Sequence, residues 1–179
     1  MDGRRIELPA LEGYETFALD GVNYEAFNTS GGLGTLAETL EGRAQYLDYK
    51  TIRYPGHRDI AKLLLQDFGL AGKRETMKDI LQTAIPATDQ DVVVVFVTAS
   101  GLRAGKRTQV SFARKVYAQT WSGMPMTAIQ ITTASSVCAV TDLFIQGKLP
   151  QSGFLRQEQV ALADFLSNRF GRAYEAAAT

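Results

Sequence analysis

The stretch YETFALDGVNYEAF, residues 14–27, predicts a β-hairpin. Apolar and polar residues alternate on both sides of the pair Asp20-Gly21, as they do in strands that bury one face. Asp-Gly is favoured in two-residue hairpin turns, because both turn positions need a positive φ angle. We therefore expect two antiparallel strands joined by a tight turn.

The region after the hairpin combines a loop with a second strand pattern. Residues 28–35, NTSGGLGT, are typical of a turn-rich loop that opens onto a short helix at Leu36–Leu40. Residues 45–53 alternate as a strand does, and Pro55-Gly56 is expected to end that strand.

Farther along the chain, helical and extended patterns alternate. The run Val92–Val97 is short, β-branched and free of polar residues, which is typical of a central strand covered on both faces. Strand-like alternation continues through Val110–Val116. Helices are expected from Asp59 to a stop at Gly69, around Met77–Leu81, over Thr127–Gln146 closed by Gly147, and over Gln157–Phe170 closed by Gly171.

These elements predict an α/β fold of the α+β type. The chain has 179 residues, 45% of them hydrophobic, which is enough for one globular domain with a real core. Without a repeat or a low-complexity linker, we expect a single domain with a mixed β-sheet packed by helices, over residues 14–174. Residues 1–13 form an N-terminal extension in this interpretation, and residues 175–179 a frayed tail.

Charge and composition exclude several classes of protein. Nineteen Lys and Arg balance nineteen Asp and Glu, so there is no net charge to attract nucleic acid or an anionic membrane. The single cysteine, Cys138, excludes an intrachain disulfide framework and is expected to be a small buried hydrophobe. No apolar run reaches the ~18 residues of a membrane span, and the N-terminus does not resemble a secretory signal. We expect a cytoplasmic protein.

The glycine cluster Gly31-Gly32-Leu33-Gly34 is the first candidate site. Glycines let a ligand approach the backbone closely, and Ser30 and Thr35 add hydroxyl groups. The spacing matches only part of a dinucleotide fingerprint. Three interpretations stay open here: a tight turn, a loop that contacts substrate, and a phosphate site.

The second candidate is the polar stretch Lys50–Arg58, which contains the only histidine of the chain. The guanidinium of Arg53 is suited to grip a carboxylate, Lys50 adds a charge, and His57 can transfer a proton near neutral pH. A lone histidine without a second ligand at a fixed spacing makes a zinc site improbable, so we expect no metal. The alternative is that His57 begins a helix and the cations are solvated.

Small hydroxyl residues in the expected long helix form the third candidate. Thr132 and Thr133 belong to the run TTASS. Such residues either line a pocket or allow close packing of the helix, and packing is the more frequent of the two.

Three stretches carry a resemblance: AFNTSGGLGTL at residues 26–36, YKTIRYPGH at 49–57, and TAIQITTASS followed by FIQGKL within 127–149. Together they resemble the C-terminal domain of the saccharopine dehydrogenase family, near its lysine 6-dehydrogenase-like members. The likeness extends from about residue 14 to 174.

The resemblance implies a substrate-binding and dimerisation domain of an oxidoreductase that acts on the C–N bond of a lysine-type amino acid. NAD or NADP would be bound by a Rossmann domain, in cis or in trans, and we expect this chain to lack that domain and to be inactive without it. A homodimer is expected. The resemblance implies catalytic roles for His57 and Lys50 and substrate contacts from Ser30, Gly31, Gly32, Thr35, Arg53, Tyr54, Thr132 and Thr133.

Two other functions remain open at this point. One is a non-enzymatic module that binds an amino acid or simply dimerises. The other is a self-sufficient enzyme that binds a nucleotide at Gly31–Gly34.

Overall fold

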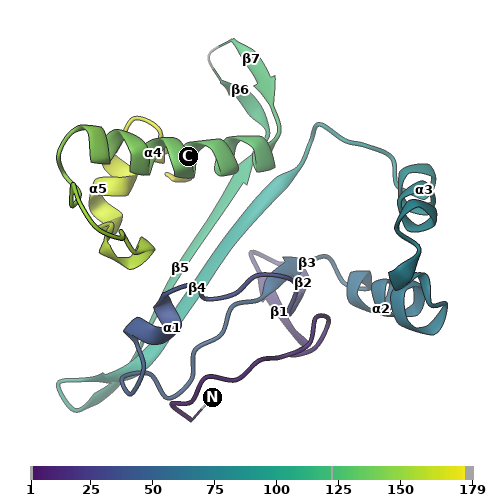
Figure 1. Cartoon of the computed structure of the whole chain (residues 1–179), viewed down its shortest axis with the longest axis horizontal. Helices are drawn as coiled ribbons and strands as arrows, with labels where there is room; N and C mark the ends of the chain where they lie inside the picture. Colours follow the sequence, from purple (N-terminus) through teal and green to yellow (C-terminus); the bar gives the residue numbers. More distant parts are fainter. Residues whose placement is uncertain (1, 122, 176–179) are drawn as a thin grey trace. The chain divides into compact units, whose positions relative to one another are not determined.

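The computed structural model describes residues 2–121 and 123–175. The chain divides into two compact units, unit 1 (Met1–Ala87) and unit 2 (Thr88–Thr179), and each has its own strands and helices (Figure 1). The α+β class expected from the sequence is confirmed. The expected domain boundaries at residues 14 and 174 stay a prediction, and residues 176–179 of the expected frayed tail lie outside the described residues.

Unit 1 is built on a three-stranded antiparallel sheet with the order β1-β2-β3. The expected hairpin is confirmed, and its turn residues Asp20 and Gly21 have φ angles of 51° and 76°. Strand β2 supplies much of the core of this unit, because its last four residues are all buried. The strands are β1 (Glu15–Leu19), β2 (Val22–Phe27) and β3 (Thr51–Arg53).

The strand expected over residues 45–53 is wrong in its first six residues, because β3 is only three residues long. At the end of β2, Asn28 exchanges backbone hydrogen bonds with Leu11 and Glu12, which precede β1, at 2.7 and 2.8 Å. Among the described residues, positions 45–50 pair with no strand, so β2 carries β3 along only three residues.

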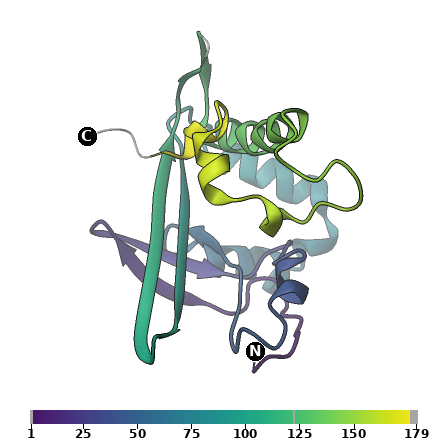
Figure 2. The ribbon, with the colours of Figure 1, turned by 90° about the vertical axis from the view of Figure 1, so that its left-hand side faces the viewer.

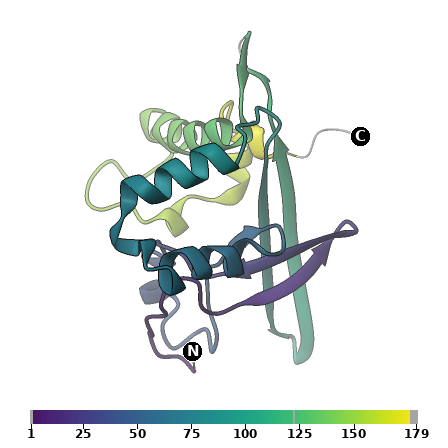
Figure 3. The same ribbon diagram turned by 90° about the vertical axis from the view of Figure 1, so that its right-hand side faces the viewer.

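One short helix of unit 1 lies between β2 and β3 in the chain, and the other helical segments follow β3 (Figure 3). The expected stop at Gly69 is confirmed, since Gly69 has a φ of 65° and ends the helical stretch. The elements are α1 (Leu36–Thr39), α2 (His57–Lys62) continued by the π-helical turn η1 (Leu63–Asp67), the 3-10 turn η2 (Leu70–Gly72), and α3 (Arg74–Ala84).

Unit 2 begins with a long antiparallel ribbon of β4 (Val92–Arg103) and β5 (Lys106–Tyr117). The two-residue turn Ala104-Gly105 joins the two strands directly, and among the described residues β4 pairs only with β5. The expectation of a central strand at Val92–Val97 is therefore wrong. A second small ribbon joins β6 (Gln119–Trp121) to β7 (Met124–Met126).

The expected mixed sheet is also wrong, because the described strands form three separate antiparallel sheets. Parallel pairing needs a long crossover connection between two strands. The ribbons of this chain are instead closed by short turns, and the one longer connection, from β2 to β3, still returns antiparallel.

The long helix α4 (Ala128–Ile145) is confirmed with both of its expected ends. Thr127 and Gln130 form a reciprocal capping box at the N-terminus, and Gly147 closes the C-terminus with a φ of 72°. Asp91 adds a carboxylate that accepts the backbone N–H groups of Ala128 and Ile129 at 2.5 and 3.1 Å.

The single last helix expected over Gln157–Phe170 is wrong, because that range holds two short helical pieces and a third begins after it at Gly171 (Figure 2). Asn168 leaves the helical conformation with a ψ of 143°. Its side chain accepts the N–H of Phe170 and donates to Asp142 of α4, at 2.9 and 2.8 Å. The pieces are η3 (Gln157–Gln159), α5 (Leu162–Ser167) and η4 (Gly171–Tyr174).

Helix α4 is long and apolar enough to cross a membrane by length and composition alone. Its buried face includes Thr132, Ser135 and Asp142 as well as apolar residues, and Ile131 lies in the core of unit 2 with Val116. These contacts are those of a core helix.

The expectation of a buried Cys138 is wrong. This residue of α4 is exposed, because it lies beside the buried stripe of the helix rather than within it.

Candidate functional site

The segments AFNTSGGLGTL and YKTIRYPGH lie side by side in unit 1. The antiparallel pairing of β2 with β3 sets Phe27 opposite Thr51 and Glu25 opposite Arg53. Beyond the last pair, the hydroxyls of Thr29 and Thr51 are 2.6 Å apart and share a hydrogen bond. The glycine loop therefore starts next to the polar stretch Lys50–Arg58, although 22 residues separate Thr29 from Thr51 in the chain.

The glycine loop borders a cavity of about 690 Å³ in unit 1. Gly31 and Gly32 line this cavity, whereas Ser30 is exposed beside it and Thr35 is the residue that precedes α1. The tight-turn interpretation also holds in part, because Gly31 and Gly34 have φ angles of 114° and 56°. The rest of the lining comes from residues 3–8, residues 28–29 and the stretch from Leu33 to Tyr49.

Lys50 is held at the cavity end of the polar stretch by two carboxylates. Its side chain is only 12% exposed, and its ammonium lies 2.9 Å from Glu15 and 3.1 Å from Asp48. Burial alone would lower the pKa of Lys50, but the hydrogen bonds to both carboxylates outweigh it and raise the pKa above its usual value. Lys50 therefore stays protonated at neutral pH. A protonated ammonium cannot accept a further proton, so Lys50 is not suited to act as a base.

Arg53 and Tyr54 present their side chains to solvent at the other end of β3. One guanidinium nitrogen of Arg53 donates to the neighbouring Ile52 carbonyl at 2.9 Å, and Arg53 has no ion pair with a described residue. The ring of Tyr54 stacks on Tyr24 with the centroids 5.6 Å apart. The fork of Arg53 is thus available to an external carboxylate.

His57 is the first residue of α2, as the alternative reading of its position predicted. Its ring stacks on the buried Phe27, with the ring planes 22° apart. Burial and the nearby Arg53 lower the pKa of His57 below its usual value, while Glu25 acts in the opposite direction. The imidazole is therefore mostly neutral at pH 7 and able to accept a proton.

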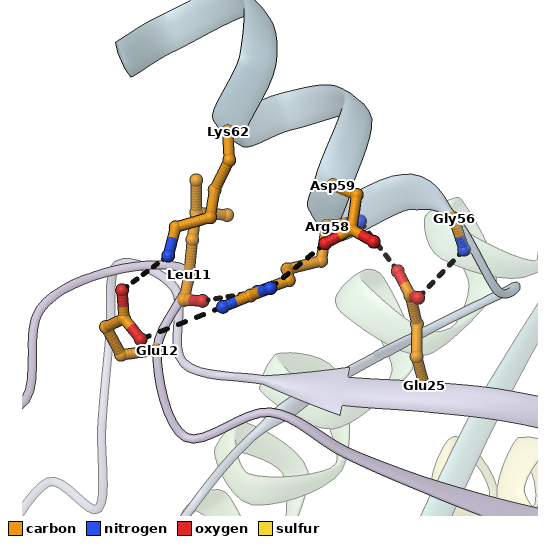
Figure 4. A network of polar contacts seen from close by, with 7 residues as sticks. All are labelled: Leu11, Glu12, Glu25, Gly56, Arg58, Asp59 and Lys62. Atoms are coloured by element: carbon orange, nitrogen blue, oxygen red, sulfur yellow. Dashed lines mark hydrogen bonds and ion pairs between the residues drawn. The ribbon is translucent and has the colours of Figure 1, made fainter. Parts of the chain in front are cut away.

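Glu25 belongs to this site and was missed in the sequence. It is 1% exposed, and its carboxylate accepts the backbone N–H groups of Gly56 and Arg58 at 2.8 and 2.6 Å (Figure 4). A sequence signal did exist, because an acidic residue shares one face of an apolar strand with Phe27.

The remaining cation of the stretch, Arg58, is also bound rather than solvated. Its Nε donates to the Leu11 carbonyl at 2.9 Å (Figure 4). In the same network, the carboxylate of Glu12 accepts a hydrogen bond from the ammonium of Lys62 at 2.6 Å. Lys50 and Arg58 thus hold the fold together, and Arg53 is left for a ligand.

Thr132 and Thr133 belong to unit 2. The hydroxyl of Thr132 is buried and donates to the Ala128 carbonyl one turn earlier at 2.9 Å, which is a contact within the helix. Thr133 is exposed. Their predicted contacts with a substrate stay a prediction.

The described residues do not fit a dinucleotide in the manner of a Rossmann fold. Every strand pair is antiparallel, and the glycine loop runs into α1, which has only four residues. No group of three potential metal ligands occurs among the described residues. In comparisons with known proteins, no family model and no solved structure matches this chain.

Proposed function

We propose that this chain is the substrate-binding and dimerisation domain of an NAD(P)-dependent oxidoreductase of the saccharopine dehydrogenase type, which acts on the C–N bond of a lysine-type amino acid. The observation that carries the proposal is the pairing of β2 with β3, together with the Thr29–Thr51 hydrogen bond. Two segments on which the resemblance rests meet there, next to Arg53, which has no ion pair with a described residue, and next to His57, whose pKa is lowered.

Arg53 is the group that binds the substrate carboxylate in this proposal. A planar guanidinium forms two parallel hydrogen bonds to a carboxylate, which a lysine ammonium does not. Tyr54 adds an aromatic surface beside it, and the glycine loop with Ser30 and Thr35 borders the rest of the ligand.

His57 is the proton carrier. An amino acid carries a protonated amine at neutral pH, and that nitrogen must lose a proton before the C–N bond is oxidised. A neutral imidazole takes this proton, whereas Lys50 keeps its own proton and serves by charge and position. NAD or NADP, held by a Rossmann domain in cis or in trans, would accept the hydride.

The proposal is tested by calorimetric titration of the purified chain with L-lysine and with saccharopine. We expect Arg53→Lys to weaken the binding of the amino acid about tenfold, because one bidentate contact is lost. Arg43→Lys is the matched control, since Arg43 is an exposed arginine of unit 1 that does not belong to β3 or to the polar stretch. Absence of binding, or equal affinities of the wild type and Arg53→Lys, would contradict the assignment.

A second measurement separates an enzyme domain from a binding module. Addition of a Rossmann partner domain is expected to give amine-dependent reduction of NAD or NADP. Binding of an amino acid without turnover in any such combination would favour a non-enzymatic amino-acid-binding or dimerisation module. A homodimer in the cytoplasm belongs to the proposal, and light scattering tests it against the monomer mass of 19.6 kDa.

A further inference from the structure

We propose that Glu25 is a positioning residue that holds His57 in place and sets how readily its imidazole takes a proton. The proposal rests on the proposed function only in treating His57 as the proton carrier. Its basis is the arrangement of β2, whose residues contact the backbone on either side of His57 and the ring of His57.

The carboxylate of Glu25 grips the backbone on both sides of His57. Gly56 precedes the histidine and donates its N–H at 2.8 Å, and Arg58 follows it and donates at 2.6 Å (Figure 4). Each oxygen takes one of these bonds, so the carboxylate spans the first turn of α2. A buried carboxylate in charge-assisted bonds of this kind is held firmly, because leaving either donor unpaired is costly.

The ring of His57 is held by the same strand. Phe27 lies two residues after Glu25, on the same face of β2, and is 1% exposed. The imidazole stacks on its ring with centroids 6.1 Å apart. Glu25 and Phe27 therefore leave His57 little freedom of position.

The charges around His57 come from two strands. Glu25 on β2 stabilises the imidazolium, and Arg53 on β3 opposes it. Glu25 and Arg53 lie opposite each other where β2 pairs with β3. His57 is therefore influenced by one negative and one positive charge that act on its pKa in opposite directions. When Arg53 binds a carboxylate, its opposing effect is reduced and that of Glu25 is not, so substrate binding favours uptake of the proton by His57.

The test is Glu25→Gln in the full chain, prepared without a histidine tag so that NMR follows one imidazole across pH. We expect the titration of His57 to move to lower pH, with its proton affinity reduced about threefold or more, because the stabilising carboxylate is gone. An unchanged titration in a folded Glu25→Gln protein would overturn the proposal.

Glu12→Gln is the matched control. It makes the same substitution in the same network, but Glu12 contacts the side chains of Lys62 and Arg58 at 2.6 and 3.8 Å rather than the backbone beside His57 (Figure 4). We expect its His57 titration to match the wild type. A shift as large as that of Glu25→Gln would overturn the proposal, since any lost negative charge would then suffice.

Glu25→Asp covers the case in which Glu25→Gln does not fold. It keeps the charge but is too short to reach both N–H groups, so we expect the ring-proton shifts of His57 to move as its contact with Phe27 loosens. Wild-type shifts in that variant would overturn the proposal. If the chain binds no amino acid but His57 still responds to these substitutions, the positioning role of Glu25 is supported and the proposed function is rejected.

Discussion

Among the described glycines of unit 2, Gly171 has the least room for a side chain. A Cβ at this position would overlap the carbonyl oxygen of Phe165, and Gly171 is itself buried. We expect Gly171→Ala to lower the free energy of unfolding by about 2–4 kcal/mol, because the backbone of α5 cannot move away without losing its packing. Urea unfolding measures the change.

The matched control for Gly171→Ala is Gly101→Ala in β4. Gly101 has no heavy atom within 4 Å of an added Cβ and no positive φ angle. We expect a change near zero. Equal effects of the two substitutions would show that the clash with Phe165 is not the cause.

Asp142 links α4 to the C-terminal segment. Because its carboxylate is hydrogen-bonded in the folded state, we expect the stability of the protein to depend on pH. Its carboxylate accepts hydrogen bonds from Asn168, Arg169 and Gln146 at 2.8, 2.7 and 2.7 Å. The bonds from Asn168 and Arg169 hold the pKa of Asp142 below its usual value. The folded state thus binds this proton less readily than the unfolded state, so the stabilisation is present above the ordinary carboxyl pKa and is lost as pH falls.

We expect Asp142→Asn to lower the Tm at pH 7 and the difference from the wild type to shrink below about pH 4. Thermal melts across pH measure both effects. Asp89→Asn is the control, because Asp89 is exposed in the same unit. A constant difference at every pH would contradict the ionic explanation.

At the scale of the element, α4 depends on the residues just before it. The Thr127 hydroxyl accepts the N–H of Gln130 at 3.3 Å, and the side-chain carbonyl of Gln130 accepts the N–H of Thr127 at 2.9 Å. We expect Thr127→Ala to cost about 1 kcal/mol of unfolding free energy, measured by urea denaturation. Thr133→Ala on the exposed face of the same helix should be neutral, and an equal loss there would contradict the capping explanation.

The same element shows what each level of structure contributes. The limits of α4 follow from Thr127 and Gly147, whose types are suited to a helix start and stop. The broken helix after residue 157 does not follow from its apolar spacing, because Asn168 leaves the helix to reach Asp142, which is 26 residues away. A local pattern predicts a helix where no distant partner competes for the backbone.

At the scale of the whole molecule, we expect a protease to cut first in the segment that connects the two units. Residues 86–90 are exposed and lie in no helix or strand, between α3 and β4. We expect proteinase K at low concentration to cut there first, since an exposed chain without ladder hydrogen bonds fits a protease active site. Mass spectrometry of the early fragments measures this, and a first cut within residues 28–50 would contradict it.

The candidate site was predictable in part from its residue types. Arg53 and His57 were identifiable because a guanidinium suits a carboxylate and an imidazole suits proton transfer. Their surroundings were not, since Lys50 and Arg58 carry the same charge as Arg53 yet are held by Glu15, Asp48 and Glu12. Only the partners of a charge decide whether it is available to a ligand.

The sequence by itself determined the features that depend on neighbouring residues. These are the Asp20-Gly21 turn, the stop at Gly69 and the capped helix α4, because turn and cap preferences belong to each residue type. Only the tertiary structure decided that Glu25 meets Arg58 across 33 residues and that Asp91 meets Ala128 across 37. Such contacts depend on which distant segments the folded chain brings together, and a buried carboxylate is stable only where that folding supplies its hydrogen-bond donors.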